Sequence, residues 1–287
     1  MKPTQRSRYA DRIDRVVQHL ADLDGDVVPD LAGLARIAAM SPFHFHRIFR
    51  LMTGETVAQM LRRVRLARAV SVLDAAASVT AAAGASGYAT SQSFARALRA
   101  QTGLSAREAR SQGAGLDTLA QALQQGDGDA ATPMRIDIVS LAPFRVLAIR
   151  NVGAYEELNA GYGRLFEQVL AQVALEQIQG IWGIPHEDPR FVPPEAFEFD
   201  CALDVGDAGT ACGELREVRI HGGRHLRLRH VGSFDALPGL IDVLYATLLD
   251  DAALEPADAP LVIHYLDDPE QVPEAELRSD CYLLLAD

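Results

Sequence analysis

The stretch SPFHFHRIFRLMTG, residues 41–54, decides the fold of the N-terminal part, and it returns in altered form as TSQSFARALRAQTG, residues 90–103. The two stretches match at an offset of 49 residues: Phe45 aligns with Phe94, and each copy ends with a Thr-Gly pair. Both begin with Ser or Thr, which are good helix N-caps, and continue with apolar residues at helical spacing. The repeat therefore predicts two copies of one helical unit.

Each copy predicts a helix with two different faces. Ser41 is the expected N-cap of the first helix, with Pro42 at its first position, and Thr90 is the expected N-cap of the second. The inward stripes hold Phe45, Ile48, Phe49 and Met52, then Phe94, Ala97 and Leu98. The outward stripes carry aromatic, imidazole, amide and guanidinium groups, which suit base edges in a major groove. These outward residues are Phe43, His46, Arg47 and Arg50, then Gln92, Ala95, Arg96 and Arg99.

Further helical patterns surround the two copies. A first helix is expected to bury Tyr9, Ile13, Val16, Val17 and Leu20. A helix between the copies has an arginine-rich polar side, on which Arg62 and Arg63 are expected to contact phosphates. Such contacts position a protein on DNA without specifying sequence.

The charge of the chain is divided unequally. The formal net charge is −12, yet residues 1–112 carry 16 Lys and Arg against 9 Asp and Glu. Because screening acts within about 10 Å, a distant acidic domain does not cancel this basic part. Gly, Ala, Gln and Asp dominate residues 113–133, which reads as a linker. Residues 113–287 form the acidic part, and from residue 134 onward they contain alternating segments typical of strands.

Residues 9–110 resemble the DNA-binding module of the AraC/XylS family of bacterial regulators, on the motifs at 34–49, 87–98 and 102–106. The resemblance implies two helix-turn-helix units in neighbouring segments of a major groove. By position it assigns base reading to Phe43, His46, Arg47, Ser91, Gln92, Ala95 and Arg96. One departure is Ala82, where the family usually has a large aliphatic residue. We therefore expect a looser second unit, with specificity mainly in the first.

A second repeat organises the C-terminal part. Residues 145–158 match residues 224–237, and later Asp200-Cys201 matches Asp280-Cys281 at an offset of about 80. Each copy reads as strand–helix–strand–strand, and two copies packed side by side commonly leave a concave ligand site at their seam. The predicted fold class is thus multi-domain: an all-α double helix-turn-helix domain over 1–112, and an α+β domain over 134–287.

The C-terminal part resembles the GyrI-like effector-binding domains, on motifs at 150–158, 180–189, 229–234 and 264–269. The resemblance implies an aromatic pocket for a small molecule, often an amphipathic cation. The candidate lining residues are Tyr155, Trp182, Phe234, His264, Tyr265 and Tyr282. The acidic residue usual in the family falls at Ile263, so either another acid such as Glu187 replaces it or the ligand is neutral.

These features predict a DNA-binding transcription regulator controlled by a small-molecule effector. Two alternatives stay open: a C-terminal domain that binds a protein partner, and a hydrolase of small molecules. We expect no enzymatic activity, because no catalytic side-chain arrangement is evident, and no cofactor or metal, because the three cysteines lack metal-ligand spacing. The expected partners are double-stranded DNA and, for an activator, RNA polymerase. No apolar run is long enough to span a bilayer, so a cytoplasmic, nucleoid-associated protein is expected.

Overall fold

A computed structural model describes residues 5–23, 29–75, 78–85, 90–103 and 136–286, together with residues 88, 105 and 108. The chain divides into two compact units, one made mainly of residues 8–129 and the other mainly of residues 130–287. The predicted linker, residues 113–133, and the side chain of Ala82 lie outside the described part.

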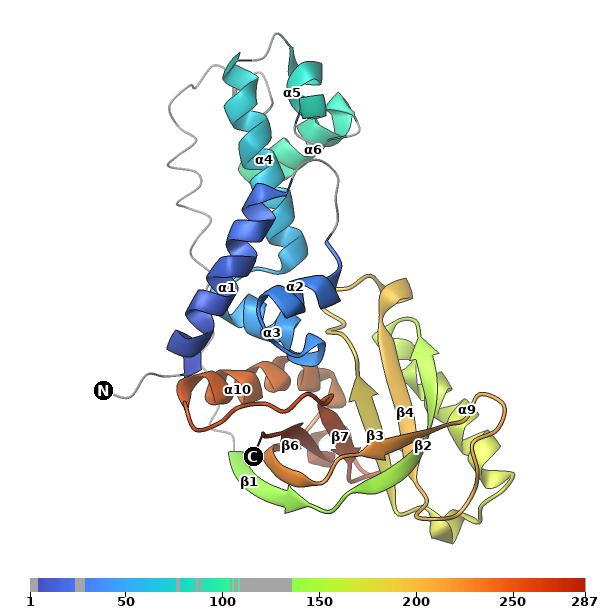
Figure 1. Ribbon diagram of the computed structural model, residues 1–287. Helices are drawn as coiled ribbons and strands as arrows, with labels where there is room; N and C mark the ends of the chain where they lie inside the picture. The colour runs from blue at the N-terminus through green and yellow to red at the C-terminus, as the bar shows by residue number, and fades with distance from the viewer. Residues whose placement is uncertain are drawn as a thin grey trace. The chain divides into compact units, whose positions relative to one another are not determined.

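The N-terminal unit is helical, as predicted. Its elements are α1 (Gln5–Asp22), α2 (Leu31–Ile37), α3 (Pro42–Thr53), α4 (Val57–Ala75), α5 (Val79–Ala85) and α6 (Ser91–Thr102), labelled in Figure 1. The repeated stretches form α3 and α6, and α4 is the long helix between the copies.

The repeated helices begin and end alike. The Ser41 hydroxyl accepts a hydrogen bond from the Phe43 amide (3.3 Å), and the Thr90 hydroxyl accepts one from the Ser93 amide (3.1 Å). The Ser93 hydroxyl in turn accepts from the Thr90 amide (3.2 Å), which completes a capping box. The glycines of the Thr-Gly pairs, Gly54 and Gly103, have φ values of +77° and +73° and end α3 and α6. The same short sequence code therefore sets both ends of each helix.

The predicted inward stripes are confirmed at five of their seven positions, and the other two, Met52 of α3 and Ala97 of α6, are half-buried. Phe45, Ile48 and Phe49 of α3 are at most 1% exposed, and Phe94 and Leu98 of α6 are fully buried. Four of the five residues expected on the buried face of α1 are also buried: Tyr9, Ile13, Val16 and Leu20. Val17 is half-buried.

The C-terminal unit is α+β, as predicted. Its strands are β1 (Ile136–Leu141), β2 (Phe144–Val152), β3 (Gly180–Pro185), β4 (Glu198–Asp204), β5 (Arg216–Ile220), β6 (Gly223–Val231), β7 (Val262–Tyr265) and β8 (Arg278–Leu284). Its α-helices are α9 (Leu158–Leu170) and α10 (Leu237–Asp250). Single 3-10 turns flank these helices at Tyr155–Glu157, Leu175–Gln177 and Phe234–Ala236, and two more precede β4 and β8, at Pro194–Ala196 and Glu274–Glu276.

Each sequence repeat begins one strand earlier than predicted. The predicted strand–helix–strand–strand units are β2-α9-β3-β4 and β6-α10-β7-β8, and β1 and β5 precede them. The sheet order is β1-β6-β8-β7-β3-β4-β2-β5. The first strand of each repeat therefore pairs with the other repeat, β1 with β6 and β5 with β2. This exchange joins the halves by backbone hydrogen bonds at both edges of the sheet, as well as at the central β3–β7 pair.

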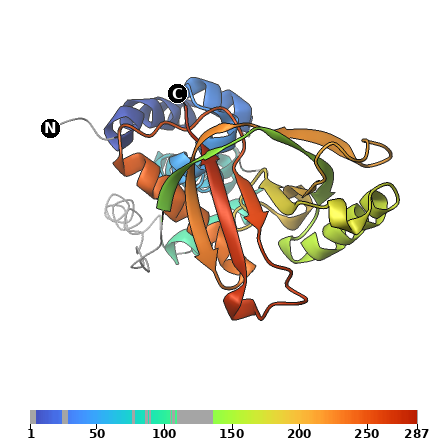
Figure 2. The ribbon, with the colours of Figure 1, turned by 90° about the horizontal axis from the view of Figure 1, so that it is seen from below.

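The connections force the sheet to curve. Only Ala142 and Pro143 join β1 to β2, and only His221 and Gly222 join β5 to β6, although these strands lie near opposite edges. Both connections cross the open side of the sheet, so the edges must approach each other; the curvature is visible in Figure 2. A Cβ atom on Gly222 would lie 2.5 Å from Pro143 Cδ and 2.7 Å from its backbone nitrogen. Glycine is therefore required where the two connections touch.

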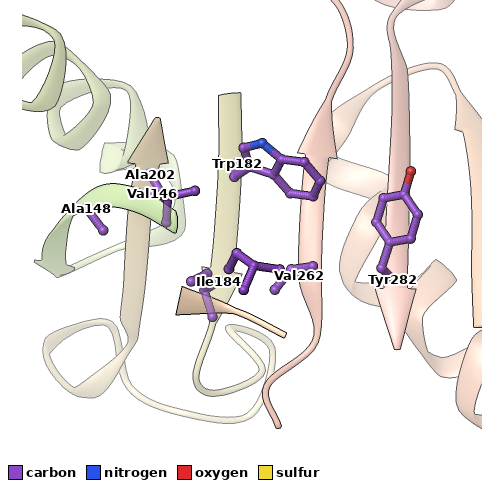
Figure 3. Close-up of a cluster of buried hydrophobic side chains, with 8 residues drawn as sticks. Val146, Ala148, Trp182, Ile184, Ala202, Val262 and Tyr282 are labelled. Atoms are coloured by element: carbon purple, nitrogen blue, oxygen red, sulfur yellow. The ribbon is translucent and has the colours of Figure 1, made fainter. Parts of the chain in front are cut away.

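The two faces of the sheet have separate cores. Inside the curve, a cluster of apolar side chains fills the concave face, and Figure 3 shows most of it. It contains Val146, Ala148, Trp182, Ile184, Ala202, Ile220, Val262 and Tyr282. The helices lie on the opposite face, where the Cys201 thiol of β4 lies 4.0 Å from the Leu158 carbonyl of α9. Because side chains alternate along a strand, neighbouring residues belong to different cores.

Candidate functional site

The outward face of α6 is the most exposed of the predicted DNA-reading surfaces. Gln92, Arg96 and Arg99 are exposed, and Ser91 and Ala95 are half-exposed beside them. The capping box fixes where the helix starts, and therefore which way these side chains point. Amide and guanidinium groups on one helical stripe can donate to adenine or guanine edges in a major groove.

The corresponding face of α3 differs from the prediction at one residue. Phe43, His46 and Arg50 are partly exposed, whereas Arg47 is only 4% exposed. The prediction that Arg47 belongs to an exposed stripe is therefore wrong for this structure. Helical spacing predicts the direction in which a side chain leaves the helix, but not which neighbouring groups cover it.

The arginines of α4 also separate. Arg62 points its Nε toward the Ala58 carbonyl of its own helix (3.3 Å), which leaves its remaining donors for a phosphate. Arg63 instead binds the Glu55 carboxylate through two nitrogens, at 2.5 and 3.1 Å. This ion pair raises the pKa of Arg63, mainly through the hydrogen bonds to Glu55. Arg63 is thus held at the start of α4, and a phosphate contact would have to compete with Glu55.

The six aromatic residues predicted to line one ligand pocket lie on two faces of the sheet. Trp182 and His264 are paired across β3 and β7, with ring centroids 4.1 Å apart and nearly parallel planes. Tyr282 lies 5.9 Å from Trp182 in the same concave core. Both Trp182 and Tyr282 are buried there, at 5% and 6% exposure. These three residues therefore form a packed interior cluster.

The other three predicted residues lie on the helical side of the sheet. Tyr265 follows His264 in β7 and so points the opposite way, where it packs edge-on against Phe234 (4.8 Å). The Tyr155 hydroxyl donates a hydrogen bond to the Phe234 carbonyl (3.1 Å), which ties the first repeat to the second. Burial raises the pKa of Tyr155 far above its usual value, so the hydroxyl stays protonated.

One further residue of the helical side, Tyr162, was not predicted from the sequence. Tyr162 of α9 packs edge-on against Tyr265 (5.9 Å), and its hydroxyl donates to the Trp182 carbonyl (2.8 Å). Its spacing from Tyr155, two helical turns on, was the available signal. Ile263, at the family's usual acidic position, is 2% exposed and apolar. Glu187 is half-buried, and its carboxylate accepts a hydrogen bond from the Glu198 amide (2.8 Å).

A cavity of about 650 Å³ opens beside Tyr155, between the two repeats. Its lining residues are Ala154, Tyr155, Glu156, Pro189, Arg190, Val192, Pro194, Phe197, Asp235, Ala236, Pro238 and Gly239. Glu156 and Asp235 occupy matching positions in the two repeats and are exposed at the rim. Arg190 is bound by the carboxylates of Asp188 (2.6 Å) and Asp242 (2.7 Å). The rim therefore offers acidic groups and aromatic faces, while its arginine is already neutralised.

One buried carboxylate in each repeat stabilises the sheet. Asp200 of β4 is 2% exposed and binds Arg150, Arg216 (2.5 Å) and His186 (2.9 Å). Although burial alone would raise it, the pKa of Asp200 is lowered to about 2 by these hydrogen bonds and charges. At the matching position, Asp280 binds Arg229 (2.7 Å) and accepts from the Tyr282 hydroxyl (3.0 Å). Asp200 and Asp280 therefore stabilise the sheet, and their existing partners leave them unavailable to a ligand.

The described residues bear on two other kinds of site. They contain no cluster of three or more His, Cys, Asp or Glu side chains placed to hold a metal ion. Among the same residues, no helix combines the length and the apolarity that a membrane crossing needs.

Comparison with known proteins identifies both units. Residues 134–286 match the model of the GyrI-like small molecule binding domain, and residues 34–112 match that of a helix-turn-helix domain. The probable transcriptional regulator YgiV of Escherichia coli K12 is 32% identical over 111 residues, or 37% of this chain and 66% of YgiV. The bifunctional transcriptional activator/DNA repair enzyme Ada of the same organism is 30% identical over 115 residues, or 40% of this chain and 32% of Ada. The chain thus spans just under two thirds of YgiV and about a third of Ada.

A solved structure of an EcmrR–DNA complex covers 90% of this chain and 100% of its own, at 12% identity and a TM-score of 0.48. Of these comparisons, the domain model of the C-terminal unit carries the assignment, because it matches more than half of the chain. The chain belongs to the GyrI-like family of small molecule binding domains, and it joins such a domain to an AraC-type helix-turn-helix domain.

Proposed function

We propose that this protein is a sequence-specific DNA-binding transcription regulator whose activity depends on a small-molecule effector. The single observation that carries the proposal is the exposed stripe of Gln92, Arg96 and Arg99 on a capped helix within an AraC-type domain. In this proposal, the predicted domain 1–112 binds operator DNA, and the predicted domain 134–287 binds the effector. In an activator, RNA polymerase would be a further partner.

Selection of duplexes from a random pool by the full-length protein tests DNA recognition. We expect a site with two readable blocks about one helical turn apart. Arg96→Ala should lower the preference for the selected duplex by about 1–3 kcal/mol at one block. Arg36→Ala is the matched control, because Arg36 is exposed on α2 of the same domain but lies outside the predicted reading stripes. Equal losses in the two variants would mean that α6 contributes only charge.

For the effector we propose an amphipathic organic cation in the 650 Å³ cavity beside Tyr155. The partly exposed aromatic ring of Tyr155 attracts cations, and Glu156 and Asp235 add negative charge at the rim. No single buried acid is needed in this arrangement, which accommodates Ile263. Burial raises the pKa of Cys201 to about 12 and keeps that thiol protonated, so Cys201 gives no support to a catalytic role.

Two ions of matched shape and opposite charge test the effector proposal. Tetraphenylphosphonium should raise the melting temperature of the full-length protein and change its affinity for the selected duplex, whereas tetraphenylborate should do neither. The double variant Glu156→Gln, Asp235→Asn should lower the affinity for the cation several-fold, since exposed charge pairs contribute up to about 1 kcal/mol each. Equal effects of both ions would refute the cationic effector. If no small molecule raised the melting temperature but a protein partner did, the result would favour the partner-binding alternative.

A further inference from the structure

A second, smaller cavity lies on the concave side of the sheet, on the face opposite to the predicted effector cavity. Its volume is about 230 Å³. It is lined by Ile184, Val218, Arg219, Ile220, His221, His225, Ala259, Pro260, Val262 and Leu284. Ile184, Ile220 and Val262 also belong to the interior cluster that contains Trp182. An apolar cavity of about 150 Å³ accepts benzene, so this one has room for a substituted single ring.

His225 is the one buried polar side chain among the residues described as lining this cavity, at 2% exposure. Its Nδ1 lies 3.0 Å from the Gly223 carbonyl. A carbonyl only accepts, so Nδ1 carries the proton, and the lone pair of the neutral ring is on Nε2. No hydrogen bond of Nε2 is found among the described residues. His225 thus presents a hydrogen-bond acceptor with no protein donor on it.

The surroundings of His225 favour its neutral form. Burial lowers the pKa of His225, and the nearby His221 lowers it further. The other polar groups around it are Arg219 at the exposed rim and Tyr282, whose ring lies edge-on to His225 at 6.1 Å. Burial raises the pKa of Tyr282 to about 12, so that hydroxyl is neutral as well. The described lining includes no Asp or Glu, its one arginine, Arg219, is exposed, and neutral His225 has no positive charge to offer an anion.

We propose that this cavity binds a small aromatic alcohol of the phenol class, whose ring lies among Val218, Ile220, Val262 and Leu284 and whose hydroxyl donates to Nε2 of His225. The site is separate from the proposed effector cavity and does not depend on it. A ring without a hydroxyl would leave the Nε2 lone pair without a donor, and an organic acid would bring a charge into an apolar space. The cavity therefore selects for one neutral donor on a compact ring.

Fluorescence titration of the full-length protein tests the proposal, because Trp182 is the only tryptophan and packs in the cluster that borders the cavity. At pH 7.5, 4-ethylphenol should bind saturably and roughly tenfold more tightly than 4-ethylanisole, which has the same ring but no donor. Affinity for 4-ethylphenol should fall at low pH, because protonated Nε2 can no longer accept. No saturable signal with 4-ethylphenol, or equal affinity for the two compounds, would overturn the proposal.

Variants locate the site. His225→Phe should abolish the preference for the phenol, and Val218→Phe should block both ligands by filling the cavity. Val139→Phe is the matched control, because Val139 packs against the same cluster without lining the cavity. If His225→Phe fails to fold, ¹⁵N NMR of histidine-labelled wild-type protein decides instead. The Nε2 resonance of His225 must shift with 4-ethylphenol and stay unchanged with 4-ethylanisole; any other pattern refutes the assignment.

Discussion

Replacing Asp200 by Asn tests how much the buried ion pairs of Asp200 stabilise the C-terminal domain. The carboxylate is 2% exposed and binds Arg150, Arg216 and His186, so the change removes the shared partner of three side chains. Its pKa is lowered from 3.8 to about 2, and each pKa unit corresponds to 1.36 kcal/mol. The folded state therefore gains about 2–3 kcal/mol from the ionised form. We expect Asp200→Asn to lower the free energy of unfolding by about 2–3 kcal/mol at pH 7.

The pH dependence of this loss identifies its cause. Because the folded pKa lies below the unfolded value, the stabilisation is complete above about pH 3.8 and disappears as the pH falls toward 2. The difference between wild type and Asp200→Asn should therefore shrink between pH 7 and pH 3. Urea unfolding followed by the fluorescence of Trp182, the only tryptophan, measures it in the right domain.

Asp207→Asn provides the control, because Asp207 is exposed in the turn after β4 and its loss should change the unfolding free energy by less than about 0.5 kcal/mol. The reasoning fails if Asp200→Asn is as stable as this control at pH 7. It also fails if the deficit of Asp200→Asn is the same at pH 3 as at pH 7, since the ionised carboxylate would then not be its source.

Three further changes have defined outcomes. Thr90→Ala removes the acceptor of the Ser93 amide and should destabilise α6 by about 1 kcal/mol, seen as faster amide exchange, while Thr90→Ser should not. Gly222→Ala should destabilise the sheet in urea unfolding by about 1–3 kcal/mol, because its Cβ meets the backbone of Pro143 at 2.7 Å, whereas Gly163→Ala on α9 meets nothing and should be neutral or stabilising. Burial lowers the pKa of His225 and His264, so the unfolded chain binds more protons and stability should fall as the pH drops below about 6.5; a rise would contradict this.

The helical half was predictable because its code is local. N-caps, helical periodicity and the closing Thr-Gly pairs act within a few residues, so the bounds of α3 and α6 and their buried stripes followed from the sequence. The ion pair of Arg63 with Glu55 was not predictable in this way, because the residues are eight apart and meet around the start of α4. The burial of Arg47 likewise depends on tertiary packing, which helical spacing does not describe.

In the sheet, periodicity identified strands without identifying their partners. The repeat predicted two similar halves, but the exchange of β1 and β5 depends on which edge each short strand meets, and no local pattern contains that. The division of the aromatic residues was predictable and was overlooked. His264 and Tyr265 are neighbours in one strand, and alternation alone places them on opposite faces. The cavity beside Tyr155 depends on loops whose conformation the sequence did not suggest.

The most direct test of the regulator proposal is the affinity of the full-length protein for its best selected duplex and for a scrambled duplex, measured by fluorescence anisotropy at several salt concentrations. The proposal predicts a preference of roughly a thousandfold for the selected duplex, with both affinities falling steeply as salt rises. Equal affinity for the two duplexes, or no enriched sequence after selection, would contradict it.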